Sequence, residues 1–152
     1  MGLASSLLDL GAEPARQAVL AALSAEHLRR SLALRGEARV RLCSGSMRPI
    51  LPAGAVANLR AVKAGETLRG AIVAVDAGER VLVHRVVAET RAEVTTRGIA
   101  SRRRDPRWPR GQIIGVVSSA HGGKSGERTL RWAALVASVA YRLRHLRLTI
   151  LL

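Results

Sequence analysis

The stretch VLVHRVVA, residues 81–88, decides the class of fold. Four of its eight residues are valine, whose β-branched side chain favours extended backbone over helix. Because side chains alternate between the two faces of a strand, His84 is expected on the same face as Leu82 and Val86. An imidazole among aliphatic neighbours is either a core histidine with a satisfied hydrogen bond or part of a functional site.

Short runs of the same kind continue on both sides of this strand. Between residues 38 and 120 apolar residues recur with a period of two, and glycine or proline separates the runs, which is the pattern of short β-strands. The other expected strands are Ala38–Cys43, Val56–Leu59, Ile72–Val75, Glu93–Thr96 and Gln112–Ser118.

Both ends of the chain are expected to be helical. Pro14 suits a first helical turn, and Gly36 suits the end of a helix. The apolar residues between them recur at helical spacing, at Val19, Leu20, Leu23, Leu28 and Leu32. The sequence therefore predicts a mainly β domain over residues 37–121, with an N-terminal helical segment over residues 1–36 and a C-terminal basic helix over residues 122–152.

The charge balance is strongly basic. Twenty-five Lys and Arg against 11 Asp and Glu give the 152-residue chain a net charge of +14. Such a charge attracts nucleic acid, but no zinc-finger, RNA-recognition or clear helix-turn-helix pattern accompanies it. We therefore interpret the charge as an arginine-rich solvated surface, and nucleic acid is not an expected partner. The single cysteine, Cys43, excludes a disulfide framework and a cysteine-based zinc cluster.

The C-terminal helix has an apolar stripe flanked by arginines. The stripe consists of Leu135, Val139, Leu143 and Leu146, and two interpretations remain open: contact with an anionic membrane surface, or packing on the chain's own domain. The longest apolar run, residues 132–141, is about half of the ~20 residues that cross a bilayer. With no secretory signal either, the sequence predicts a cytoplasmic or peripherally membrane-associated protein.

The stretch CSGSMRP, residues 43–49, follows an expected strand at a turn. Gly45 permits unusual backbone angles, and Pro49 biases the residue before it away from helix. A serine at such a turn presents its hydroxyl and its backbone N–H to a substrate carbonyl, as a nucleophile and half of an oxyanion site. Taken alone, Ser-Gly-Ser is a common loop sequence.

A serine nucleophile needs a base, and His84 is the candidate. The other three histidines, His27, His121 and His145, fall in the expected helices or in a glycine-rich connector, where we expect them on the surface.

Several motifs in order resemble the catalytic region of the signal peptidase I family. They are Ser-Met-x-Pro, Val-His-Arg, Thr-x-Gly and Ile-Ile-Gly-Val-Val, and they span about residues 40–118. The chain is most similar to the archaeal and endoplasmic-reticulum branch, in which histidine takes the position of the bacterial lysine. The resemblance implies a signal peptidase/LexA-like β catalytic domain and a serine endopeptidase that cleaves a precursor or exported polypeptide without a cofactor or metal.

The resemblance also assigns roles to individual residues. Ser46 would be the nucleophile and His84 the general base, and Ser44 matches the serine whose hydroxyl helps to bind the oxyanion beside the N–H of Ser46. The remaining motif residues are assigned to the oxyanion and substrate-binding side of the site; these are Met47, Pro49 and Arg85.

The family's acidic residues are only partly present. Family members carry an acid directly after the glycine of Thr-x-Gly, where this chain has Ile99, and a second acid six residues later, where it has Asp105. Asp105 would therefore orient His84, with Asp76 after an expected strand as the weaker candidate; without an acid the site would be a Ser46–His84 dyad. The family's transmembrane anchor beside the nucleophile is also missing, which favours a specialised peptidase acting on a particular leader or precursor.

Two other functions remain open. The missing acid would suit a catalytically impaired homologue that only binds peptides. A LexA-like regulatory protein shares the expected β fold, but it would use a Ser–Lys pair after a DNA-binding domain, and neither feature is visible.

Overall fold

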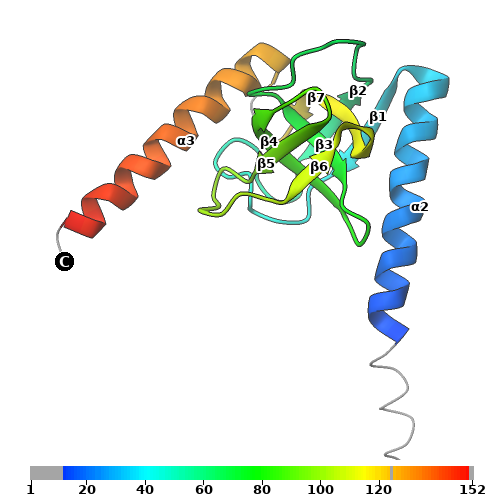
Figure 1. Ribbon diagram of the computed structural model, residues 1–152, viewed down its shortest axis with the longest axis horizontal. Helices are drawn as coiled ribbons and strands as arrows, with labels where there is room; N and C mark the ends of the chain where they lie inside the picture. Colours follow the sequence, from blue (N-terminus) through cyan, green and yellow to red (C-terminus); the bar gives the residue numbers. More distant parts are fainter. Residues whose placement is uncertain (1–11, 124, 151–152) are drawn as a thin grey trace, which may run out of the picture.

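The structure is a computed structural model that describes residues 12–123 and 125–150, with side chains over residues 23–123 and 125–144. Seven strands form one antiparallel sheet, in the order β1-β2-β7-β3-β4-β5-β6. A helix flanks this sheet at each end of the chain (Figure 1). The elements are α2 (Ala12–Arg35), β1 (Glu37–Arg41), β2 (Val56–Arg60), β3 (Ile72–Asp76), β4 (Val81–Glu89), β5 (Glu93–Arg97), β6 (Arg107–Pro109), the 3-10 helix η1 (Arg110–Gln112), β7 (Ile113–His121) and α3 (Glu127–Ile150).

The expectation of a mainly β unit with a helix at each end is confirmed at this level. The sequence missed β6, because a three-residue strand ending in proline carries almost no periodic signal. Strand β7 runs on to His121, which the sequence placed in a connector. Residues 1–11 of the predicted N-terminal segment and residues 151–152 lie outside the described residues.

The centre of the sheet carries apolar side chains on both faces. Residues 72–75 of β3 are all at most 1% exposed, because β3 lies between β7 and β4 and a hydrophobic cluster covers each face. Register shifts occur in the β2–β7, β3–β7 and β4–β5 pairings, and irregularities of this kind bend and twist a sheet.

Helix α2 ends as the sequence predicts. Gly36 has a φ of 75°, and its N–H donates to the carbonyl oxygen of Leu32 at 2.9 Å, as in a glycine C-cap. Leu28 and Leu32 pack into the core. Leu23 does not: its side chain is 58% exposed and lines a cleft described below.

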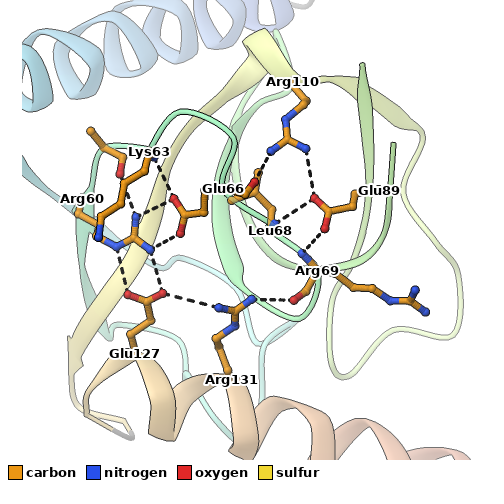
Figure 2. Close-up of polar contacts among 10 residues, drawn as sticks. Arg60, Lys63, Glu66, Leu68, Arg69, Glu89, Arg110, Glu127 and Arg131 are labelled. Carbon is orange, nitrogen blue, oxygen red and sulfur yellow. Dashed lines mark hydrogen bonds and ion pairs between the residues drawn. The ribbon is translucent and has the colours of Figure 1, made fainter. Parts of the chain in front are cut away.

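Ion pairs fix the start of α3 to the sheet (Figure 2). Arg60 of β2 donates from Nε and Nη2 to the carboxylate of Glu127 at 3.0 and 2.9 Å, and it also binds Glu66. Arg131, one turn into α3, donates to the carbonyl oxygen of Arg69 at 2.7 Å. The hydrogen bonds from Arg60 outweigh partial burial and lower the pKa of Glu66 from 4.5 to about 2.

The predicted apolar stripe of α3 is not the face that packs on the domain. Leu130 and Ala134 are buried there, whereas Leu135, Val139 and Leu143 are 48%, 49% and 57% exposed. The side chain of Leu146, the fourth predicted member, lies outside the described part of the helix. Neither α2 nor α3, over the residues described, has a stretch long and apolar enough to cross a membrane.

Candidate active site

A loop between β1 and β2 presents Ser46. The loop is closed at its base, because Leu42 N–H donates to the carbonyl oxygen of Ala55 at 2.9 Å and Gly54 N–H donates to that of Leu42 at 2.7 Å. Met47 and Leu51 are fully buried and anchor the loop in the core. Ser46 therefore lies between the hydrogen-bonded base of the loop at Leu42 and the buried side chain of Met47.

Three side chains from distant parts of the sequence form a hydrogen-bonded chain. His84 Nε2 lies 3.0 Å from Ser46 Oγ, and His84 Nδ1 lies 2.6 Å from Asp105 Oδ2. His84 belongs to β4, where Val73 of β3 is its register partner, so it lies on the sheet face of Leu82 and Val86 as predicted. This is the spatial order of a nucleophile, a base and an orienting acid.

Two further residues extend the chain beyond the acid. Thr96 Oγ1 donates to Asp105 Oδ2 at 2.6 Å, and Trp108 Nε1–H donates to Thr96 Oγ1 at 2.9 Å. Because an indole N–H can only donate, the threonine hydroxyl must give its own proton to the carboxylate. Neither residue was predicted from the sequence, although a partly buried tryptophan needs a partner for its N–H.

The same logic fixes the tautomer of His84. An ionised Asp105 can only accept, so His84 Nδ1 carries the proton and Nε2 is free to accept from the hydroxyl of Ser46. Burial raises the pKa of Asp105, but the hydrogen bonds from His84 and Thr96 outweigh this effect, and the pKa lies below its usual value. Asp105 is therefore ionised over the neutral range.

Ser44 and Gly98 complete the surroundings of the serine. Ser44 Oγ lies 3.1 Å from Ser46 Oγ. A Cβ at Gly98 would lie 2.8 Å from the carbonyl oxygen of Ser46 and 3.2 Å from His84 Nε2, so the chain can pass the site this closely only as glycine. The next residue, Ile99, is 2% exposed and belongs to the hydrophobic core.

An open cleft of about 1010 Å³ leads to Ser46 and His84. Its walls come from α2, from residues 39–44 and from residues 79–84. In β1 the backbone groups of Leu42 bond toward β2, so by the antiparallel alternation those of Arg39 and Arg41 point away from β2, along the open edge. The backbone groups of this strand edge thus border the cleft, and the carbonyl oxygen of Arg41 accepts only a weak hydrogen bond there, from Cys43 Sγ at 3.9 Å.

A second open edge lines the same cleft. Strand β4 pairs with β5 only from Arg85 onward, so its first residues have a partner on the β3 side alone. Val86 N–H bonds toward the β3 side, to the carbonyl oxygen of Ala71 at 2.8 Å, and the alternation therefore directs the backbone groups of Val81 and Val83 away from β3.

Three residues assigned to substrate binding lie elsewhere. Met47 is fully buried in the core. Pro49 follows a cis peptide bond, is exposed, and does not line the cleft. Arg85 points to the opposite face of β4 from its neighbour His84, because successive side chains of a strand alternate, and it donates to Ser138 of α3 at 3.0 Å. Over the described residues, no group of three or more His, Cys, Asp or Glu side chains could hold a metal ion.

Comparisons with protein-family models, with curated proteins and with solved structures found no match to this chain. Its function is therefore inferred from the geometry of the site and from the order of its motifs.

Proposed function

We propose that the protein is a serine endopeptidase, similar to signal and leader peptidases, that cleaves a peptide bond in a precursor or exported polypeptide. The observation that carries the proposal is the unbroken hydrogen-bonded chain from Ser46 through His84 to Asp105, placed at the end of a cleft. A partly buried polar chain of this kind is costly to assemble unless each member is satisfied.

The first chemical step follows from the protonation states. Ser46 Oγ attacks the carbonyl carbon of the scissile bond as its proton passes to His84 Nε2. Asp105 stabilises the imidazolium that forms, and it keeps the Nδ1 proton in place. The N–H of Ser46 and the hydroxyl of Ser44 are the donors for the oxyanion, the latter by turning from Ser46 Oγ to the substrate oxygen.

The second half of the reaction releases the two products. His84 gives its proton to the leaving amine, which breaks the C–N bond and leaves an acyl ester on Ser46. Water then enters, loses a proton to His84 Nε2 and attacks the ester, and the serine recovers its proton as the new carboxyl end leaves.

The two open strand edges favour an extended polypeptide as the substrate. A peptide laid between β1 and the start of β4 would pair with backbone groups on either side, which is strand addition. Apolar side chains of the cleft, among them Val40 and Leu82, suit small or apolar substrate residues, and main-chain pairing brings a carbonyl group toward Ser46.

A fluorophosphonate probe tests the proposal without a known substrate. Such a probe phosphonylates an activated serine irreversibly, with loss of fluoride, and peptide mass spectrometry locates the modified residue. We expect wild-type protein to be labelled at Ser46, Ser46→Ala to be unlabelled with an unchanged circular dichroism spectrum, and Ser125→Ala, which removes an exposed serine, to react like wild type.

A folded wild-type protein that takes no label at Ser46 would refute the peptidase. The replacement of the family's first acid by Ile99 favours, as the second candidate, a module that binds peptides without cleaving them. That candidate predicts peptide binding that Ser46→Ala leaves intact and no labelling of the wild type.

A further inference from the structure

Two arginines lie directly opposite each other on neighbouring strands. Arg85 of β4 and Arg97 of β5 are register partners, so their side chains leave the same face of the sheet at adjacent positions. Like charges in this position destabilise a sheet unless something neutralises them.

Helix α3 brings a third arginine to the pair. Arg85 Nη1 donates to Ser138 Oγ at 3.0 Å, which fixes the arginine against the helix. Arg142 lies one turn further along α3, on the same side as Ser138. Burial lowers the pKa of Arg85, and the charges of Arg97, Arg142 and Arg69 lower it further. The cations therefore face one another across the space between the sheet and α3.

No carboxylate among the described residues forms an ion pair with Arg85, Arg97 or Arg142. Arg85 Nε is also buried without a hydrogen-bond partner, and an unsatisfied buried donor of a charged group is costly. In Figure 2 the side chain of Arg69 extends away from the ion pairs that hold α3, and only its backbone N–H and carbonyl oxygen take part in the hydrogen bonds drawn there.

We propose that Arg85, Arg97 and Arg142 form a binding site for a phosphate group. A phosphate carries up to two negative charges and several acceptor oxygens, enough to bridge three guanidinium groups. Its negative charge would remove the repulsion between the arginines across β4 and β5. This site is separate from the cleft at Ser46, because Arg85 and His84 point to opposite faces of β4, and it does not depend on the proposed peptidase activity.

Thermal unfolding in inorganic phosphate tests the site, with chloride at the same ionic strength as the reference. Phosphate at roughly ten times its Kd should raise the Tm of the wild type by about 3–6 °C. Arg97→Gln and Arg142→Gln should lose this rise. Arg91→Gln, which removes an exposed arginine in the turn between β4 and β5, should keep it.

In chloride alone, without phosphate, we expect the Arg97→Gln variant not to be destabilised. Arg97→Gln removes a like charge beside Arg85, so its Tm in chloride should equal or exceed that of the wild type. The site is refuted if the Tm of the wild type is no higher in phosphate than in chloride at the same ionic strength. It is also refuted if phosphate raises the Tm of Arg142→Gln and of Arg91→Gln equally. Arg142 is exposed, so its replacement leaves the fold intact and keeps the comparison valid.

The phosphate group could be free or part of a lipid headgroup, and α3 bears the exposed residues Leu135, Val139 and Leu143 on its outer side. Sedimentation with phosphatidylcholine vesicles, with and without phosphatidylglycerol, separates the two sources. Binding that requires phosphatidylglycerol and is weaker in Arg142→Gln than in Arg91→Gln identifies the headgroup. Equal binding of these two variants assigns the site to free phosphate.

Discussion

Replacing Asp105 with asparagine tests how the acid acts on His84. One oxygen, Oδ2, accepts from both His84 Nδ1 and Thr96 Oγ1. Because Trp108 donates to the threonine hydroxyl, that hydroxyl must donate to residue 105, and it will hold the amide of asparagine with its oxygen in the place of Oδ2. Asp105→Asn therefore keeps the productive tautomer and loses only the negative charge.

The expected loss of rate follows from that charge. Two charges with centres about 4 Å apart interact by about 4 kcal/mol at an effective dielectric constant of about 20. The Asp105 side chain is 18% exposed, so solvent screens part of this, and we expect a loss of about 2–4 kcal/mol. Fluorophosphonate labelling of Ser46 should slow by about 30- to 1,000-fold, less than the roughly 10⁴-fold loss that accompanies an inverted tautomer.

A second substitution removes the hydroxyl that orients the amide. When Thr96→Val is combined with Asp105→Asn, the introduced amide can turn its NH₂ group toward His84, and the labelling rate of the double variant should fall to about 10⁻⁴ of wild type. Thr96→Val alone should slow labelling by less than about tenfold, because the carboxylate still accepts from Nδ1. The second-order labelling rate constant is the measurement, made on variants whose circular dichroism shows them folded.

The outcome depends on non-additivity. If Asp105→Asn alone costs about 10⁴-fold or more, or if the double variant equals the product of the single ones, Thr96 does not orient residue 105 and its proposed role is refuted.

Three further outcomes follow from other contacts. Gly98→Ala should slow fluorophosphonate labelling by about 10- to 100-fold, because its Cβ would lie 2.8 Å from the carbonyl oxygen of Ser46. Gly111→Ala, whose Cβ meets nothing within 4 Å, should label at the wild-type rate. Equal labelling rates of the two variants would contradict the close approach at Gly98. The pKa of Glu66 is lowered to about 2 by Arg60, so its contribution to stability is present above pH 4.5 and is lost as the pH falls toward 2. Urea unfolding of Glu66→Gln should give a lower midpoint at neutral pH and a shallower loss in acid; a pH profile parallel to wild type would argue against the ion pair. Trp108→Phe removes one partly buried donor and should lower the Tm by about 2–4 °C, with an unchanged Tm as the contrary result.

The sequence predicts the strands well where a packing face imposes a pattern. The run around His84 and the four apolar residues from Ile72 indicate strands, because burial on one or both faces selects β-branched and apolar side chains there. The order of the motifs also brought Ser46, His84 and Asp105 together as candidates, and the structure places them in contact.

The outer part of the site and the packing side of α3 depend on contacts that the periodicity of the sequence does not encode. Thr96 meets Trp108 across two strands whose pairing is set by the β5–β6 register, and no local pattern indicates a three-residue strand. Met47 and Arg85 were grouped with the site because they neighbour its residues in sequence, but a buried anchor and the alternating faces of a strand direct them elsewhere. In α3 an apolar stripe exists on two sides, so spacing alone does not reveal which side packs.

The two open strand edges that line one cleft have a consequence for the timing of cleavage. If the protein is the proposed peptidase, only a segment that is straight over several residues could pair with both edges, and a helix or a tight turn in the precursor would be rejected until it unfolds. Cleavage would then compete with folding of the precursor: a segment that folds quickly escapes, and one that stays extended is cut. Under this scheme the folding rate of the substrate, as much as its sequence, selects the bond that is hydrolysed.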